Sequence, residues 1–80
     1  MFYVYILKSK NSQYYIGYTN NIEDRLRHHN SGASKYTRIN RPWSIIYTEK
    51  FVDKKLAWLR EKQIKSYKGG VAFKKLIKID

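Results

Sequence analysis

One stretch of the sequence is crowded with side chains that can donate, accept or move a proton. Residues 14–32, YYIGYTNNIEDRLRHHNSG, contain three tyrosines, two arginines and two histidines. On a helix through this stretch, Arg25 and His29 lie one turn apart, beside an apolar stripe made by Ile22 and Leu26. They would stand at the boundary between core and solvent, near a helix start, which favours bound anions. The simpler interpretation is a surface arginine and a half-buried histidine.

Two carboxylates remain as candidate ligands for a hard cation, Glu49 and Glu61. The other four of the six acids have an evident local position, as a helix cap, in a first helical turn or at the chain end: Asp53, Glu23, Asp24 and Asp80. Glu61 falls at the edge of the apolar face of a helix, where an ion pair with Lys65 is its simpler role. One carboxylate can hold Mg²⁺ when water and a substrate phosphate complete the shell.

The net charge is the most informative property of the composition. Seventeen lysines and arginines against six acids give +11, and such a field attracts polyanions, of which nucleic acid is the commonest. The cations are dispersed over the whole chain, so they belong to a folded surface rather than to a tail. We therefore expect a nucleic-acid partner, DNA above all, bound with little sequence preference.

Size and cysteine content narrow the class further. Eighty residues leave room for one core, so we expect a single domain over residues 1–80. Without cysteine, neither a disulfide framework nor a thiolate metal site is available. The apolar run at residues 2–7 is too short for a membrane span and has no basic region before it. We expect a cytoplasmic protein with no signal peptide and no membrane partner.

Three segments have the pattern of strands. Residues 2–7, FYVYIL, are aromatic and β-branched on both alternating sets, which predicts a central strand buried on two faces. Residues 14–19, YYIGYT, would pair with it as an antiparallel hairpin, and residues 43–51, WSIIYTEKF, form a third strand. Gly17 indicates a close backbone approach or a bulge. Cross-strand aromatic packing is the simplest role for the tyrosines of the first two strands.

Helix signals fill the gaps between these strands. Asn21 is a good N-cap for a first helix that ends by Gly32. Asp53 caps a second helix over residues 54–68, which a pair of glycines stops. Residues 71–79 would form a last short helix, with a strand as the alternative. The expected fold is α/β (α+β), with element order ββαβαα.

Residues 31–42, SGASKYTRINRP, are expected to form a long basic loop because they have no apolar period. A loop of this length in so small a domain is either disordered or functional. Lys35, Arg38 and Arg41 would contact the substrate backbone, and Tyr36 could stack on an unpaired base. The simpler alternative is a solvated, flexible loop.

Two triplets and three later residues resemble the signature of the GIY-YIG nuclease superfamily. YVY at 3–5 has tyrosine where the family has glycine, and YIG at 15–17 is intact. The arginine of the family falls on Arg25, its histidine or tyrosine one turn later on His29, and its metal-binding glutamate on Glu61. The resemblance covers nearly the whole chain. It is closest to small stand-alone members, which are similar to the N-terminal catalytic domain of the excision-repair nuclease.

The resemblance implies a fold and a reaction. The fold would be a three-stranded antiparallel sheet flanked by helices. The reaction would be one-metal hydrolysis of a phosphodiester bond, with Mg²⁺ or Mn²⁺ as the cofactor. Tyr18 stands where several relatives carry a lysine, and a phenol there can still form a hydrogen bond.

The resemblance also implies a role for each matched residue. Tyr5, or a water that it activates, would help to remove a proton from the attacking water, and Tyr15 would hydrogen-bond in the site. Arg25 would neutralise the nonbridging oxygens as charge develops. Glu61 would hold the metal against the scissile phosphate. His29 would act as an acid or base, or position the phosphate.

Two functions follow from these residues. The first is a metal-dependent DNA endonuclease, directed by the structure of its substrate rather than by sequence and placed in DNA repair. The alternative is a nucleic-acid-binding domain of the same fold with little or no cleavage. The joint presence of Tyr5, Tyr15, Arg25 and Glu61 favours the first, because pure binding needs no buried carboxylate among cations. Since no second DNA-reading module is expected, a protein partner could supply substrate specificity.

Overall fold

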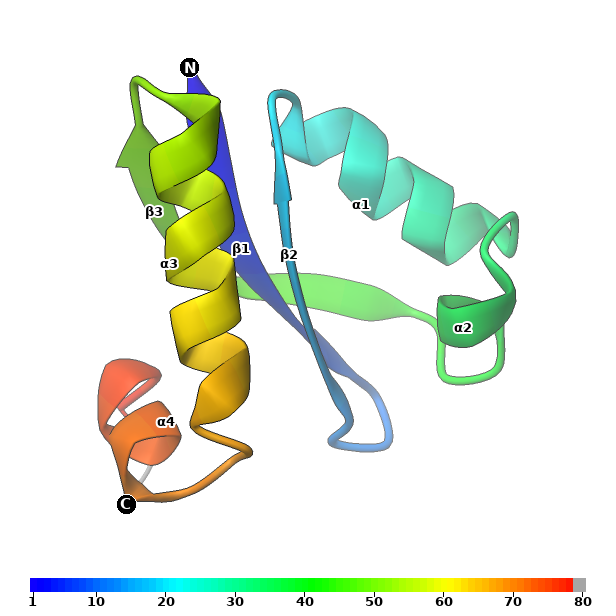
Figure 1. The fold of residues 1–80 in the computed structure, drawn as a ribbon. Coiled ribbons are helices and arrows are strands. Elements are labelled where there is room, and N and C mark those ends of the chain that lie inside the picture. The colour runs from blue at the N-terminus through cyan, green and yellow to red at the C-terminus, as the bar shows by residue number, and fades with distance from the viewer. Residues whose placement is uncertain (79–80) are drawn as a thin grey trace.

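Three antiparallel strands form the centre of the protein (Figure 1). They are β1 (Phe2–Ser9), β2 (Tyr14–Thr19) and β3 (Trp43–Phe51), and they lie in the order β2-β1-β3. The structure is a computed structural model, and it describes residues 1–78. The prediction of an antiparallel sheet with the first strand in its middle is confirmed.

The helices lie on both faces of this sheet (Figure 1). They are α1 (Ile22–Ser31), α2 (Lys35–Arg38), α3 (Lys54–Ser66) and α4 (Val71–Leu76). The predicted order ββαβαα is confirmed, with the short helix α2 added before β3. The last segment is a helix rather than a strand, and its expected end at Ile79, like Asp80, lies outside the described residues.

Local capping sets where the helices begin and end. The side chain of Asn21 accepts a hydrogen bond from the backbone N–H of Asp24, and Gly32 closes α1 in the left-handed conformation. Asp53 caps α3 by accepting from the backbone N–H of Lys55. Within the described part of the chain, none of the helices is both long enough and apolar enough to cross a bilayer.

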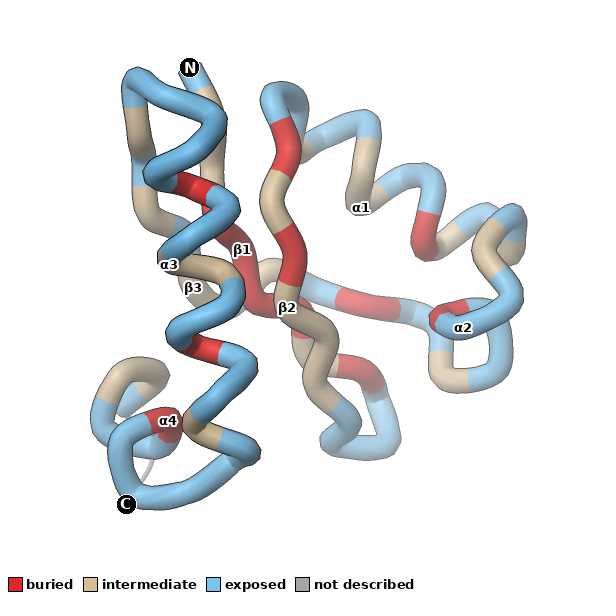
Figure 2. The backbone as a smooth tube through the Cα atoms, viewed as in Figure 1, coloured by how far each residue is buried: buried red, intermediate tan, exposed pale blue. Residues whose placement is uncertain are grey.

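β1 divides the core into two halves, because its successive side chains point to opposite faces of the sheet. Val4 and Ile6 face α3 and α4, where they pack with three buried residues: Ala57, Ile64 and Phe73. Tyr5 and Leu7 face α1, where they pack with Trp43. Figure 2 shows the buried residues concentrated along β1. Removal of this apolar surface from water is the main driving force for the fold.

The segment expected to be a loop, residues 31–42, is more ordered than its sequence indicates. α1 runs on to Ser31, and residues 35–38 form α2, so the prediction of a loop is wrong for this part. Thr37 is fully buried, whereas the side chain of Tyr36 next to it is 76% exposed. A helix this short, with a single buried polar residue, produces no apolar stripe that periodicity could detect.

Candidate active site

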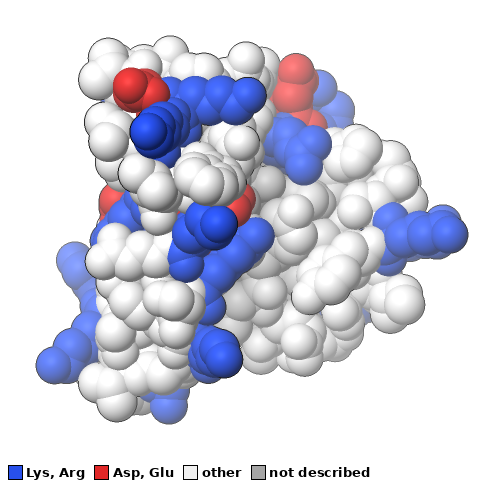
Figure 3. Space-filling model, viewed as in Figure 1, with Lys and Arg blue, Asp and Glu red and all other residues white. Residues whose placement is uncertain are grey.

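A cleft of about 570 Å³ opens at the edge of β2, between α1 and α3. Ten residues from β1, β2, α1, α3 and one turn line it: Phe2, Tyr5, Tyr15, Gly17, Tyr18, Thr19, Asn20, Arg25, Lys54 and Glu61. The structure therefore brings Tyr5, Tyr15, Arg25 and Glu61 together, although they come from four separate elements. Figure 3 shows Lys and Arg side chains along α3 and around the neighbouring surface.

Tyr5 reaches the cleft by lying across the backbone of its neighbouring strand. It stands opposite Gly17 in the β1–β2 register. A Cβ atom on Gly17 would lie 2.6 Å from the Tyr5 hydroxyl oxygen, closer than atoms of this kind approach. The close backbone approach that the sequence indicates at Gly17 is therefore present.

A buried chain of hydrogen bonds leads from the cleft to α2. The Tyr5 hydroxyl lies 3.2 Å from Nε2 of His29, and Nδ1 of His29 lies 2.9 Å from Oγ1 of Thr37. The backbone carbonyl of Thr37 accepts a hydrogen bond from Nε1 of Trp43 at 2.8 Å. His29 is 1% exposed, so it lies behind Tyr5 rather than at the half-buried boundary.

The electrostatics of this chain favour neutral groups. Burial lowers the pKa of His29 to about 4, and the positive charge of Arg25 adds to that effect. His29 is therefore an uncharged imidazole at neutral pH. Burial raises the pKa of Tyr5, with Arg25 opposing the shift, so the phenol also keeps its proton.

Arg25 lies close to the phenols of Tyr5 and Tyr15. Proximity of the Tyr5 phenol raises the pKa of Arg25, so its guanidinium is a permanent positive charge. The Nε atom of Arg25 is buried, and it has no hydrogen-bond partner among residues 1–78. Because Arg25 also lines the cleft, its guanidinium can meet an oxygen ligand such as a phosphate there.

Glu61 is the carboxylate of the cleft. Its side chain is 13% exposed, and Nζ of Lys65 lies 3.3 Å from its Oε1, so the predicted ion pair is present as well. Among the described residues, no group of three or more His, Cys, Asp or Glu side chains is placed to hold a metal. A single carboxylate in a cleft that also holds Arg25 fits Mg²⁺, which keeps several waters and takes phosphate oxygens.

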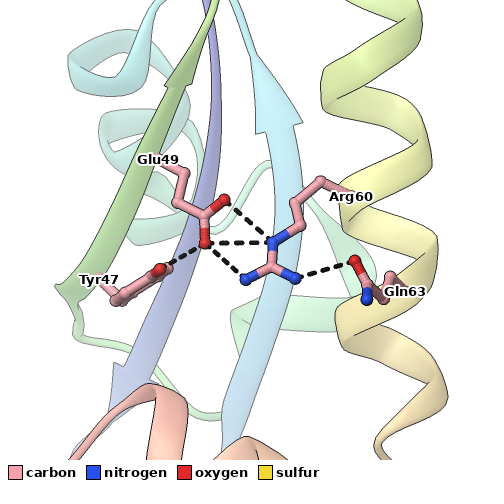
Figure 4. Close-up of polar contacts among 4 residues, drawn as sticks. All are labelled: Tyr47, Glu49, Arg60 and Gln63. Carbon is pink, nitrogen blue, oxygen red and sulfur yellow. Dashed lines mark hydrogen bonds and ion pairs between the residues drawn. The ribbon is translucent and has the colours of Figure 1, made fainter.

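The structure commits the second candidate carboxylate, Glu49, to another role (Figure 4). Nε and Nη2 of Arg60 donate to its two oxygens at 2.9 and 2.8 Å, and the hydroxyl of Tyr47 donates as well. Arg60 is held in turn by Gln63, at 2.8 Å. These bonds lower the pKa of Glu49, with Arg60 the main cause. Glu49 therefore lies outside the cleft with its acceptor sites in use, which leaves Glu61 as the candidate ligand.

The four residues expected to contact nucleic acid are all exposed: Lys35, Tyr36, Arg38 and Arg41. Tyr36 lies beside Tyr15, with 5.9 Å between the ring centroids. Both rings line a second hollow of about 450 Å³, next to the cleft. The three cations of this segment line neither hollow.

Lys54 and Thr37 contribute polar groups at or behind the cleft, and the sequence reasoning did not single them out. Lys54 lines the cleft, and its position directly after the cap Asp53 was a signal that a cation stands at the start of α3. Thr37 fixes the ring of His29, but nothing in its sequence context marks it, because the contact depends on how α2 packs on α1.

A sequence model of the GIY-YIG catalytic domain matches residues 1–73. The chain belongs to the GIY-YIG family. It is 46% identical over 66 residues to a UPF0213 protein of Staphylococcus haemolyticus, a match that covers 81% of this chain and 80% of that protein. It is 48% identical over 66 residues to a UPF0213 protein of Clostridium perfringens, covering 81% and 71% of the two chains.

The solved structures include a similar protein. The solution NMR structure of a UPF0213 protein from Bacillus halodurans matches 90% of this GIY-YIG chain and 90% of its own, at 35% identity and a TM-score of 0.50. The similar fold and the relatives together show a small UPF0213 protein built on the GIY-YIG catalytic domain.

Proposed function

We propose that this GIY-YIG protein is a metal-dependent endonuclease that hydrolyses phosphodiester bonds in DNA. The observation that carries the proposal is the convergence of Tyr5, Tyr15, Arg25 and Glu61 on one cleft. Substrate choice would follow DNA structure rather than sequence. The resemblance to the catalytic domain of the excision-repair nuclease extends the proposal to DNA repair in the cytoplasm.

Arg25 would receive the scissile phosphate. Its guanidinium carries a permanent charge, and because Arg25 lines the cleft it can donate hydrogen bonds to the nonbridging oxygens there. As negative charge develops on those oxygens, a fixed cation in a partly enclosed cleft stabilises it more than water would. Lys54, which lines the same cleft from α3, would add positive charge at the phosphate.

Tyr5 would orient the attacking water and take its proton. In one tautomer of His29, Nε2 accepts a hydrogen bond from the phenol while Nδ1 donates to Thr37. The phenol can then pass its proton to Nε2 as its oxygen accepts a proton from water. Because the pKa of His29 is about 4, His29 would return that proton to the Tyr5 oxygen, which would release the proton taken from the attacking water to solvent in the cleft. His29 would thus act through Tyr5, and Tyr15 would hydrogen-bond beside it.

Glu61 would hold the divalent cation from α3, while Arg25 contacts the phosphate from α1. Mg²⁺ or Mn²⁺, when bound, supplies charge stabilisation to a phosphate oxygen and to the leaving group. The low exposure of Glu61 and its position in the cleft suit that role. Displacement of Lys65 would free Oε1 of Glu61 to bind the cation as well.

The test is incubation of the protein with end-labelled DNAs of different structure: single-stranded, flapped, branched and damaged duplex forms. We expect cleavage with Mg²⁺ or Mn²⁺ and none with EDTA. A preparation of the E61Q variant, purified in the same way, controls for contaminating nucleases. If no DNA in the panel is cut, the protein is a nucleic-acid-binding domain of the GIY-YIG fold, and the endonuclease proposal is wrong.

A further inference from the structure

A third hollow extends the cleft along the start of α3. It measures about 530 Å³ and is lined by five residues: Tyr18, Asp53, Lys54, Lys55 and Trp58. Tyr18 and Lys54 also line the cleft, so the two hollows adjoin each other at these residues. We call this space the Trp58 hollow.

The Trp58 hollow combines a large aromatic ring with positive charge. The side chain of Trp58 is 39% exposed, and Nζ of Lys62 lies 4.4 Å from its ring centroid. Lys54 and Lys55 are exposed cations of the same wall. The one acid, Asp53, already caps α3, with its Oδ1 accepting from the backbone N–H of Lys55 at 2.7 Å. A flat ring attached to a negatively charged backbone is complementary to this surface.

We propose that the Trp58 hollow binds the nucleobase that flanks the scissile phosphate, by stacking on Trp58. The proposal rests on the proposed function, because it takes the cleft as the place of the phosphate. A DNA strand that leaves the cleft over Tyr18 and Lys54 enters this hollow directly. Its next base then meets the indole ring, while the lysines contact its backbone.

The opposite end of the cleft supports a path of this kind. The hollow lined by Tyr15 and Tyr36 adjoins the cleft there, since Tyr15 lines both. An aromatic surface therefore follows the cleft on each side. A base that stacks on a side chain has left its duplex stack, so the favoured substrate has an unpaired nucleotide beside the cleaved bond. Stacking of this kind tolerates any sequence, because every base has a π face.

The first test uses the fluorescence of the unaltered protein. It has two tryptophans, and Trp43 is buried, with its Nε1 bonded to the carbonyl of Thr37, so Trp58 is the one that a ligand can reach. In EDTA and at low salt, a short single-stranded DNA should quench the emission. A DNA of equal length and charge with abasic residues should quench it much less. Equal quenching by both DNAs would overturn the proposal. EDTA prevents cleavage, so this result does not depend on enzymatic activity.

The second test measures affinity for the same two DNAs in EDTA. W58A should weaken binding of the DNA with bases by roughly five- to a hundred-fold, the range for loss of one stacked base, and leave abasic DNA unaffected. W58F should restore most of the affinity, because phenylalanine also stacks. L59A removes an exposed apolar side chain from the same helix and should bind like the parent. Equal losses on both DNAs, or no loss in W58A, would overturn the stacking role.

These tests separate the two proposals. If DNA with bases and abasic DNA quench equally while the protein still cleaves DNA, the base-binding role of the Trp58 hollow is wrong and the endonuclease proposal stands. If binding depends on the bases but no metal-dependent cleavage is seen, the stacking site stands and the endonuclease proposal is wrong. The flanking phosphate is then bound but not cut.

Discussion

Two carboxylates lie at the two edges of α3, Glu49 of β3 at one edge and Glu61 of α3 itself at the other, and they differ in their bonding. At the edge facing β3, Glu49 is 22% exposed and uses both oxygens in bonds to Arg60 and Tyr47 (Figure 4). At the edge facing β2, Glu61 is 13% exposed, and its one ionic neighbour among the described residues is Lys65. Glu49 and Glu61 differ in how many of their acceptor sites are unused rather than in how deeply they are buried. A carboxylate with its partners in place holds structure together, whereas one with capacity left can bind a ligand.

The two edges are also connected, because Arg60 and Glu61 are successive residues. The ion pair between Glu49 and Arg60 fastens α3 to β3. Ala57 and Ile64 of the same helix are buried against the sheet, and this packing orients α3. Glu49 therefore adds stability to a helix that Glu61 uses to reach the cleft.

The largest expected effect is that of E61Q. Substitution keeps the size and helix propensity of the side chain but removes the charge that holds a hard cation. Cleavage should fall by roughly a thousandfold or more, since a catalytic metal contributes several kcal/mol. DNA affinity should be retained or improved. The melting temperature should change little, because the pair of Glu61 with Lys65 is an i,i+4 helix pair with a half-exposed lysine, and such pairs contribute only ~0.3–0.5 kcal/mol. A nicking assay beside a binding assay and a thermal melt measures all three.

If E61Q cleaves like the parent protein, the contrast between the two edges of α3 fails. Glu61 would then be no metal ligand, and Glu49 would have to be reconsidered despite its bonds to Arg60.

Two neighbouring histidines of α1 extend the comparison to a second pair, since His28 is exposed and His29 is buried. The unfolded chain protonates His29 near pH 6.5, whereas the folded protein keeps it neutral down to about pH 4. The unfolded state thus binds more protons in this window, so stability should fall as the pH is lowered from about 6.5 to 4. The expected loss is up to ~3 kcal/mol, measured by denaturant unfolding at a series of pH values.

Matched variants identify the histidine responsible. H28Q should keep the acid-side slope of the parent, and H29Q should flatten it even if it lowers stability overall. An H29Q protein with the parental slope would show that another group titrates in this window.

The third prediction concerns E49Q, which removes the charge of the carboxylate that bonds to Arg60 and Tyr47 on the β3 side of α3. Its free energy of unfolding should fall by ~1–3 kcal/mol, because Arg60 loses charged hydrogen bonds. The lowered pKa of Glu49 contributes stability above about pH 4.3, and this contribution disappears as the pH falls through the lower folded-state pKa. E49Q should lack that component, while the folded variant still cleaves. E23Q, at an exposed acid, is the control and should melt like the parent.

A feature of the fold or of the candidate site could be predicted from the sequence when it depends on residues that are close together in the chain. The caps Asn21 and Asp53 and the alternation along β1 are readable because each depends on a few successive residues. The position of each carboxylate in the sequence did not decide between Glu49 and Glu61, because that depends on how β3 and α3 meet, and the assignment to Glu61 came from the resemblance to the family. Thr37 escaped for the same reason: its contact with His29 requires the turn between α1 and α2.

The smallest effect is expected away from both edges of α3. The triple variant K35A/R38A/R41A removes the exposed cations of the α2 segment and should weaken DNA binding several-fold while the fold stays intact. If each contacts a phosphate, the slope of log affinity against log salt should become less negative by roughly 2 to 3. Binding titrations at several salt concentrations, with circular dichroism as the check on folding, test this.

A control with the same loss of charge separates contact from net charge. It removes three exposed lysines from the C-terminal end of the described chain: Lys68, Lys74 and Lys75. Equal effects of the two triple variants would show that the α2 segment makes no special contact with DNA.

Gly17 shows what the glycine of the family motif contributes. Its φ angle lies outside the left-handed region, so the backbone at this position suits any amino acid. What only glycine supplies is vacant space, into which the ring of Tyr5 extends to place its oxygen at the cleft. Even the single methyl group of alanine would lie 2.6 Å from the oxygen of that phenol, so the ring of Tyr5 would have to move. The motif therefore specifies a side chain on one strand and the room for it on the next, so residues 5 and 17 act as one steric unit.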